Sequence, residues 1–574
     1  MINMKRKKYI EILTYFILLI TFLAPRLVEL NSFATLDEPY WLSMGSNFYY
    51  ALGQREFQNT VYEYQPAVTT MWIVTAAMIL YFPEYRGLGQ GYLEFEKGAL
   101  DPFLLAHGQD PLVLLEYARL IQVVLISGLF LLLYYLLQRI FSSPIAFFIT
   151  LFASLDPYLL GQSRLLNHEG MISIFVMLSV LAFYIFIKHD RRMPYLILSG
   201  ILCGLAQLTK SSAMAILLPV GVLMLGQVFE GPRKQWGRVL GEQAKYFAIW
   251  FGVTLITYFL LWPGMWVAPL KMLGVVYGNA FSYAFQGARL SAITEEVPVT
   301  PFSLSNTFLG MWDLIKVIIW RTTPLTWVGA LLGVAAYFVR GSMVEGSLRR
   351  FLNLLVLTGI AFVLLFGVAE GRNSPHYLLT TYLALNMFAA WGWCSLILWL
   401  VQVRGLRVPY LLGLSLCAFQ LWSAASFYPY YFTYRNPILY ALGGYAEYPQ
   451  KPYGEGLEHA AAYLAGLPDA KDSVALTYYA RGCFSFFYPG ETTRFKPYYV
   501  DDGYEDEFSQ ALRSADYLVV YYAAQIQSER YDSFFAALAD VPPLHEIWLN
   551  DYKYVVIYDL HTLPQATFQA LTQK

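Results

Sequence analysis

Charged residues are scarce in this chain. Only 14% of its 574 residues are charged, whereas a soluble domain carries roughly 25%. The formal net charge is −1, so no global field favours nucleic acid, and we expect no nucleic-acid partner. In contrast, 57% of the residues are hydrophobic and the mean hydropathy is +0.44, which indicates an integral membrane protein.

Cysteine is also scarce. Three of the four cysteines lie in apolar runs, and Cys483 stands alone in the more polar C-terminal part. This distribution argues against a disulfide framework, even for a part of the chain outside the cytoplasm. The sequence contains no internal repeat, heptad pattern or low-complexity tract, which excludes solenoids and coiled coils.

Apolar runs long enough to cross a membrane dominate the first three quarters of the chain. A bilayer core needs about 20 apolar residues per helix. We predict about eleven spans, at 9–29, 117–138, 144–160, 170–188, 195–210, 212–229, 244–263, 324–340, 350–369, 376–401 and 407–427. The segments 66–82 and 307–321 are shorter or interrupted by charge, and we interpret them as interfacial helices. If both crossed the membrane, the count would rise to 13.

The distribution of basic residues predicts the orientation. Lysine and arginine gather on alternate connections, at residues 5–8, 139, 188–192, 233–238, 340–350 and 404–407. By the positive-inside rule these connections are cytoplasmic, as is the N-terminus. A first outer loop (30–116), a second long outer loop (264–323) and the C-terminal part then lie outside a plasma membrane.

The C-terminal part has the pattern of a soluble α/β domain. Residues 454–467 show the periodicity of an amphipathic helix, and residues 472–479, 516–522 and 552–560 read as buried strands. We therefore predict a polytopic α-helical membrane domain (1–430) followed by an extracytoplasmic α/β domain (431–574).

Two adjacent carboxylates, Asp37 and Glu38, follow the first span. Like charges this close raise one pKa, which suits a general base. Alternatively, they form the first turn of a helix, where acidic side chains interact favourably with the helix dipole.

Several cationic and polar residues fall on the same predicted outer side. The short second outer connection carries Arg164, His168 and Glu169. Arg164 can bind a phosphate or form an interfacial ion pair with Glu169, and His168 taken alone fits a structural role.

Lys210 also lies on the outer side, against the positive-inside trend, where it either holds an anion or extends to the headgroups. The last outer connection adds Arg372, His376 and Tyr377. Together these residues predict a site that binds phosphate and accepts a proton beside the lipid.

These motifs, in this order, resemble those of the GT-C glycosyltransferases, in particular protein O-mannosyltransferases and lipid A aminoarabinose transferases. The matching segments are 35–41 (TLDEPYW), 64–66 (YQP) running to Trp72, Asp156-Pro157 with Arg164 and Glu169, 204–210 (GLAQLTK), 262–266 (WPGMW) and 376–379 (HYLL). Gln65 stands where the family commonly has His or Lys, Glu169 where it has Asp, and His376 where it has Arg. These departures leave open the sugar and the use of a divalent metal.

The resemblance implies a GT-C fold and inverting transfer of a hexose or pentose from a polyprenyl-phosphate carrier to an acceptor hydroxyl of a glycan, lipid or protein. It implies Asp37 as catalytic base with Glu38 as its neighbour. It also implies a donor-phosphate set (Lys210, Arg164, Arg372 and His376) and supporting residues (Glu169, His168, Tyr377 and Gln65), with no metal ligand assigned. The absence of a Gly-rich nucleotide loop agrees with a lipid-linked donor.

Two other classes remain as alternatives. A secondary transporter or lipid flippase usually has repeated halves and charged groups near the bilayer midplane, whereas here the spans are nearly free of charge. A scaffold that only displays its soluble domain would not need the acidic motif.

Overall fold

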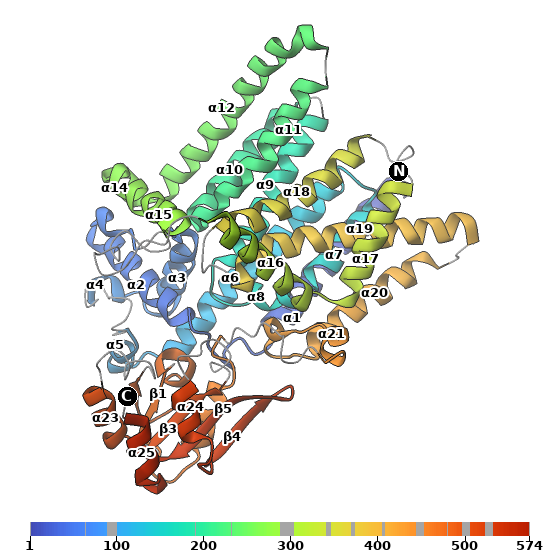
Figure 1. Ribbon diagram of the computed structural model, residues 1–574. Helices are drawn as coiled ribbons and strands as arrows, with labels where there is room; N and C mark the ends of the chain where they lie inside the picture. The colour runs from blue at the N-terminus through green and yellow to red at the C-terminus, as the bar shows by residue number, and fades with distance from the viewer. Residues whose placement is uncertain are drawn as a thin grey trace. The chain divides into compact units, whose positions relative to one another are not determined.

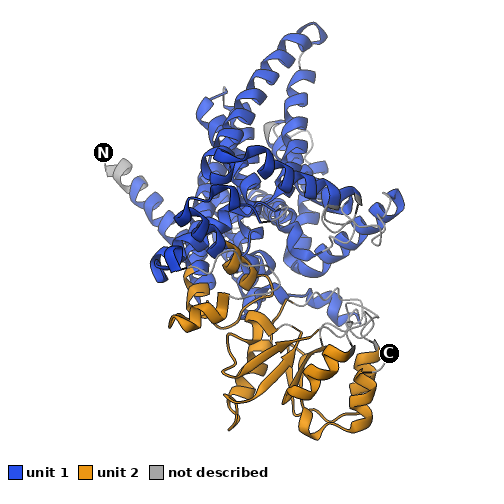
Figure 2. Cartoon of the chain, turned by 90° about the vertical axis from the view of Figure 1, so that its left-hand side faces the viewer, with its two compact units in different colours: residues 1–28, 45–89, 118–448 blue, residues 29–44, 90–117, 449–574 orange. Residues whose placement is uncertain are grey.

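The structure is a computed structural model in which the chain forms two compact units (Figures 1 and 2). It describes residues 2–62, 65–88, 100–189, 191–230, 232–286, 303–339, 346–368, 374–404, 408–443, 453–478, 480–495, 505–522 and 532–572. Unit 1 comprises Met1–Val28, Gly45–Gly89 and Ala118–Tyr448, and unit 2 comprises Glu29–Met44, Gln90–Tyr117 and Pro449–Lys574.

Unit 1 is built almost wholly of helices. Its longer helices are α1 (Ile2–Leu27), α3 (Val68–Tyr81), α7 (Ser143–Ser154), α9 (Glu169–Lys188), α10 (Met193–Thr209), α11 (Leu217–Phe229), α12 (Trp236–Leu261), α16 (Leu304–Arg321), α17 (Pro324–Val339), α18 (Gly346–Val368), α19 (Leu379–Arg404) and α20 (Pro409–Ala425). Two more, α2 (Glu38–Gln54) and α6 (Pro111–Leu137), have residues in both units.

Short helical turns connect these elements. They are η1 (Phe57–Asn59), α4 (Tyr85–Leu88), α8 (Pro157–Ser163), η2 (Ser211–Ile216), η3 (Arg233–Gln235), α13 (Pro263–Val267), α14 (Pro269–Leu273), the π-helical η4 (Gly274–Gly278), α15 (Asn279–Gln286), η6 (Pro375–Leu378), η7 (Tyr431–Thr433) and α21 (Pro437–Ala441).

The chain is a multi-pass membrane protein, as its sequence predicts. Within the described residues, seven helices are long and apolar enough to cross a membrane, or nine if each of two bent pairs forms one span. Each of the eleven predicted spans contains a helix, but α10 and α20 have only 17 residues each. The count of eleven therefore stays a prediction.

Both bent pairs break at polar residues. α7 and α8 meet at 72°, where Asp156 accepts a hydrogen bond from the Leu159 amide (3.0 Å) and caps α8. α16 and α17 meet at 113°, next to Thr322 and Thr323. The second bend agrees with the prediction that 307–321 forms a helix separate from the span after it.

Helix α9 lies at the centre of unit 1. It is buried from Glu169 to Phe186 and packs against α10 and α19. A helix that is apolar on every side can pack against other helices all round, and such helices are typically buried in a core.

Small residues let α17 and α19 approach closely. A Cβ atom added at Gly392 of α19 would collide with the backbone of Gly329 and Gly333 of α17, and one added at Gly329 would lie 2.6 Å from the Ala389 carbonyl oxygen. Such contacts are common between membrane helices, because small residues bring the backbones together.

Gly392→Val is therefore expected to force α17 and α19 apart and to lower the melting temperature of the detergent-purified protein. The matched control is Gly252→Val in α12, where an added Cβ atom meets nothing within 4 Å. Equal melting temperatures for the two variants would contradict this account of the packing.

Unit 2 contains a five-stranded mixed sheet in the order β2-β1-β3-β5-β4. The strands are β1 (Val474–Thr477), β2 (Glu491–Arg494), β3 (Tyr517–Tyr521), β4 (His545–Leu549) and β5 (Tyr552–Asp559). β1 pairs in parallel with β2 and β3, whereas β5 pairs antiparallel with β3 and β4. The three predicted strands are confirmed as β1, β3 and β5, and the predicted helix as α22 (Leu457–Ala465).

Helices cover this sheet and complete its core. The remaining helical elements of the unit are α5 (Leu100–Ala106), the π-helical η9 (Ala480–Phe484), α23 (Glu505–Ser514), α24 (Asp532–Leu538), η13 (Leu560–Thr562) and α25 (Gln565–Thr572). Side chains of α23, α24 and α25, including Phe508, Phe534 and Leu571, pack against Leu518 and Val556 of the sheet. All four cysteines are free and buried.

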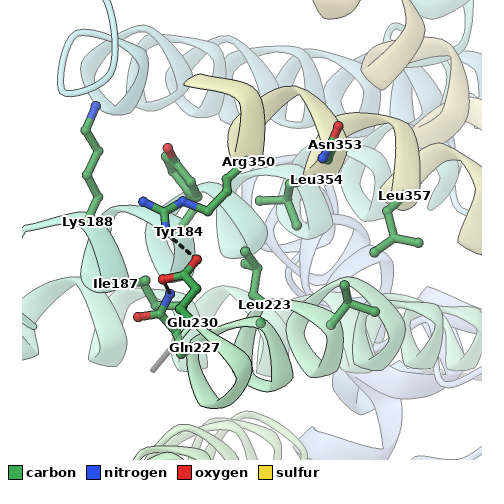
Figure 3. Close-up of a pocket in the computed structure, with 12 residues that line it drawn as sticks. Tyr184, Ile187, Lys188, Leu223, Gln227, Glu230, Arg350, Asn353, Leu354 and Leu357 are labelled. Atoms are coloured by element: carbon green, nitrogen blue, oxygen red, sulfur yellow. Dashed lines mark hydrogen bonds and ion pairs between the residues drawn. The ribbon is translucent and has the colours of Figure 1, made fainter. Parts of the chain in front are cut away.

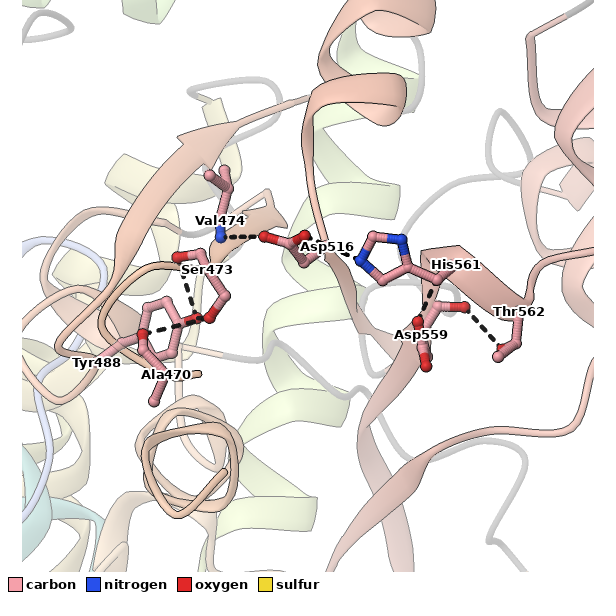
Figure 4. A network of polar contacts seen from close by, with 8 residues as sticks. All are labelled: Ala470, Ser473, Val474, Tyr488, Asp516, Asp559, His561 and Thr562. Atoms are coloured by element: carbon pink, nitrogen blue, oxygen red, sulfur yellow. Dashed lines mark hydrogen bonds and ion pairs between the residues drawn. The ribbon is translucent and has the colours of Figure 1, made fainter. Parts of the chain in front are cut away.

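A polar network joins three strands of this sheet (Figure 4). Asp516, just before β3, accepts a hydrogen bond from the Val474 amide of β1 (2.7 Å) and lies 3.0 Å from Nε2 of His561. The His561 amide in turn donates to Asp559 at the end of β5 (2.9 Å). The network fixes the start of β1 and β3 against the end of β5.

Candidate active site

Most of the sequence-predicted site residues that the structure describes fall into two clusters, one in each unit. The cluster in unit 1 is centred on Lys210, which ends α10, and Glu169, which begins α9. Both side chains are buried, and Nζ of Lys210 donates a hydrogen bond to Oε1 of Glu169. An acidic residue at a helix N-terminus and a basic residue at a helix C-terminus are each favoured by the helix dipole.

The start of α9 is further fixed by its neighbours. Nε2 of His168 lies 3.3 Å from the same Glu169 oxygen. The Asn167 side chain accepts a hydrogen bond from the Glu169 amide (3.0 Å) and donates one to Gln162 (3.0 Å). The predicted alternative of an Arg164–Glu169 ion pair is not found, since the cation that contacts Glu169 is Lys210.

Aromatic rings surround the Lys210 ammonium. It lies 4.1 Å from the ring centre of Tyr377 and 5.7 Å from that of Phe366, both within the range of cation–π attraction. Tyr377 stacks on Phe366 and contacts the His376 ring, with centres 5.0 and 4.6 Å apart. The structure thus brings together five predicted site residues: His168, Glu169, Lys210, His376 and Tyr377.

The segment that contains Gln65 reaches the same end of α10. Gln65 is buried. Two residues later, the Ala67 amide donates to the Thr209 carbonyl (3.2 Å), and the Thr69 and Thr209 hydroxyls are 2.8 Å apart. These bonds hold the segment beside the residue that precedes Lys210.

Arg164 is held by the protein backbone. Its guanidinium donates to the carbonyl of Val28 and, at 3.3 Å, to that of Pro429, and it lies over the Tyr431 ring. Arg26, for which the sequence predicts no role, is equally buried and donates to the Ser163 hydroxyl and the Ser154 carbonyl, both at 2.7 Å. Arg372 lies outside the described residues.

The second cluster, in unit 2, contains Asp37 and Glu38. Glu38 is fully buried and accepts hydrogen bonds from the amide and the hydroxyl of Thr35, both at 2.8 Å. This pattern resembles a capping box, in which an acidic residue satisfies the start of a helix. Asp37 precedes the helix and is partly exposed. The first-turn interpretation applies to Glu38, which begins α2. The general-base interpretation stays a prediction for Asp37, which retains access to solvent.

Residues from the C-terminal part of the chain bind Asp37. The Tyr453 hydroxyl donates to Oδ2 of Asp37, and the Tyr453 carbonyl accepts from the Leu36 amide (3.1 Å). Glu455 accepts from the Tyr453 amide (2.6 Å) and from the Tyr521 hydroxyl of β3 (3.1 Å). Sequence reasoning missed Tyr453, because nothing local links positions 416 residues apart.

A partly buried ion pair supports the first turns of α2. Arg481 lies 3.7 Å from Asp101 and donates to the Ser43 hydroxyl and the Pro39 carbonyl. Burial raises the pKa of Asp101 to about 6, although Arg481 opposes the shift, and burial also lowers the pKa of Arg481. Among the described residues, no group of three His, Cys, Asp or Glu side chains is arranged to hold a metal ion.

Part of the first cluster lies in a segment that matches a known protein family. Residues 115–272 match the family model described as dolichyl-phosphate-mannose-protein mannosyltransferase. This match confirms the resemblance to the GT-C glycosyltransferases drawn from the sequence motifs. It includes Arg164, His168, Glu169 and Lys210, but not Asp37, Glu38, Gln65, His376 or Tyr377.

Solved structures similar to this chain are distant in sequence. ArnT from Cupriavidus metallidurans bound to undecaprenyl phosphate is 15% identical, covering 95% of this chain and 97% of its own, with a TM-score of 0.45. The Archaeoglobus fulgidus oligosaccharyltransferase in the apo form is 14% identical, covering 90% and 70%, with a TM-score of 0.43. The arabinofuranosyltransferase AftD from Mycobacteria is 13% identical, covering 91% and 40%, with a TM-score of 0.32. No curated protein matches the sequence.

The buried pair generates a stability prediction. Glu169→Gln leaves the Lys210 ammonium buried without its carboxylate, and Lys210→Met leaves Glu169 without its ammonium. Loss of one partner from a buried pair costs about 3–5 kcal/mol, so both single variants should melt well below the wild type. The double variant Glu169→Gln/Lys210→Met buries no uncompensated charge and should regain most of the loss.

An exposed pair on α16 provides the control for this experiment. Asp313 and Lys316 are 2.7 Å apart and about half exposed, so Asp313→Asn should change stability by about 0–1 kcal/mol. A double variant no more stable than the singles would show that the Glu169–Lys210 contact is not what the single substitutions disrupt.

Proposed function

We propose that this protein is a membrane glycosyltransferase that transfers a sugar, with inversion, from a polyprenyl-phosphate carrier to an acceptor hydroxyl. The transfer takes place at the extracytoplasmic face of the plasma membrane, with the N-terminus in the cytoplasm and the C-terminal domain outside. The observation that carries the proposal is the buried Lys210 ammonium at the end of a membrane helix, inside the segment that matches the mannosyltransferase family.

Lys210 is suited to the carrier phosphate. Its ammonium lies where α10 ends, so a phosphate at the membrane surface can reach it without leaving the interface. The Lys210 ammonium donates to Glu169, and its positive charge can attract a phosphate. As the sugar leaves, negative charge grows on the phosphate, and a cation fixed beforehand stabilises that charge more than it stabilises the bound substrate.

The other proposed phosphate ligands rank behind Lys210. His376 packs against Tyr377, whose ring lies over the Lys210 ammonium, and Arg372 stands four residues before it in the sequence. Arg164 donates to two backbone carbonyls, which hold its charge in place near the start of α9.

Asp37 is the proposed catalytic base. It accepts the proton of the acceptor hydroxyl while that oxygen attacks the anomeric carbon, and the carrier phosphate departs from the opposite side. Its partial exposure supports this role over Glu38, whose carboxylate is buried against Thr35. Glu38 then orients the segment on which Asp37 lies.

Asp37→Asn keeps the shape of the side chain and removes the base. General base catalysis contributes typically 10²–10⁴-fold, so kcat with a saturating polyprenyl-phosphate sugar should fall by about that factor while donor binding persists. Asp472→Asn, an exposed carboxylate of the same unit, is the control and should retain wild-type turnover. Near-normal turnover of Asp37→Asn would move the role to Glu38 or Glu169.

Tyr453→Phe tests whether the C-terminal part of the chain tunes this base. A hydrogen bond to an ionised group is worth about 1.5–3 kcal/mol, and here it favours the ionised carboxylate. Its loss should move the acidic limb of the kcat–pH profile to higher pH. Tyr463→Phe, in α22, supplies the control. A fall in kcat without any change in the pH profile would assign Tyr453 a structural role only.

A further inference from the structure

A cleft of about 540 Å³ opens at the other end of helix α9 from Glu169 (Figure 3). It is lined by the ends of α9 and α11 and by the beginning of α18. α9 has 20 residues, and at about 1.5 Å per residue the cleft lies about 30 Å from Glu169, close to the thickness of a bilayer core. The cleft is therefore separate from the cluster around Lys210.

The lining of this cleft changes from charged to apolar along α11 and α18. The outermost residues are Lys188 at the end of α9, Glu230 just after α11 and Arg350 near the start of α18. One turn deeper lie Tyr184, Gln227 and Asn353, and deeper still Leu223, Leu354 and Leu357. A phospholipid has the same order of layers: a charged phosphate, polar ester groups and acyl chains.

The charge of the cleft is suited to an anion. Lys188 and Arg350 are cationic and Glu230 is anionic, which leaves one net positive charge. Arg350 pairs with Glu230 at the half-exposed rim (Figure 3). Among the described residues, Lys188 has no acidic partner within ion-pair distance. A phosphodiester carries one negative charge and would complete the balance.

We propose that this cleft binds an anionic phospholipid of the leaflet facing the basic connections, with its phosphate at Lys188 and Arg350 and its acyl chains between α11 and α18. Basic pockets between membrane helices on the cytoplasmic side are known to select such headgroups. The proposal is independent of the transferase activity, since no residue of the cleft belongs to the site proposed for it.

Two glycines of α11 make the proposal testable. A Cβ atom added at either Gly226 or Gly221 would meet nothing within 4 Å, but only Gly226 lines the cleft. Gly226→Leu should therefore place a branched side chain in the cleft and obstruct it, with no clash at the Cβ atom. Gly221→Leu should add the same side chain to the same helix outside the cleft.

The experiment measures the melting temperature of delipidated protein in detergent with added dioleoyl-phosphatidylglycerol, dioleoyl-phosphatidylcholine, undecaprenyl phosphate or glycerol 3-phosphate. Phosphatidylglycerol should raise the melting temperature of the wild type and of Gly221→Leu. The rise should vanish in Gly226→Leu and fall by at least half in Lys188→Gln. Without lipid, Gly226→Leu should melt with the wild type, which shows that it is folded.

Four results would overturn the proposal. An equal rise in melting temperature with phosphatidylcholine would mean that the cleft does not select the charge of the headgroup. An equal rise with glycerol 3-phosphate would mean that the acyl chains are not bound. A larger rise with undecaprenyl phosphate, lost in Gly226→Leu, would assign the cleft to the carrier lipid. A rise that persists in Gly226→Leu would place the bound lipid elsewhere.

Discussion

The cost of burying charge in a membrane controls where this protein can place polar chemistry. An ionised side chain near the bilayer centre costs several kcal/mol, so the spans are nearly free of charge and ionised groups gather where helices end. Helix α9 shows both consequences. Its first residue, Glu169, contacts Lys210 at the end of α10. Its last residue, Lys188, lines the cleft together with Arg350 of α18. The proposed chemistry at one end of α9 and the proposed lipid site at the other follow from the same constraint.

A buried ion pair such as Glu169–Lys210 is weak evidence for stability, because well-packed apolar residues often stabilise a fold as much. The pair matters more because it fixes the position of the Lys210 ammonium. Glu169 offsets the cost of burying the ammonium before any substrate arrives, and the ring of Tyr377 limits where the ammonium can point. In the proposed mechanism, the carrier phosphate then meets a cation that is already desolvated and oriented, which favours the charge that develops late in the reaction.

Sequence patterns predicted the elements whose signals are local. Apolar runs gave the positions of the membrane helices, and buried strands such as β5 stand out because most of their residues are apolar or aromatic. The edge strand β2 reads Glu491-Thr-Thr-Arg494 and carries no such signal, since its side chains are mostly in contact with water. Lys210 and Glu169 could be grouped because both follow from topology, whereas their direct contact, and the bends at Asp156 and Thr322, depend on packing that no local pattern encodes.

The choice between Asp37 and Glu38 shows the same limit in the proposed site. The two carboxylates are adjacent and chemically alike, so the sequence alone cannot separate them. They differ in burial and in hydrogen-bond partner. Thr35 donates to Glu38, and Tyr453 from the distant C-terminal part of the chain donates to Asp37. The carboxylate best suited to act as a base is thus defined by residues 449–574 as much as by its own loop. In the proposed mechanism the soluble part is a condition for the membrane enzyme's chemistry, because its fold holds the segment that carries the base.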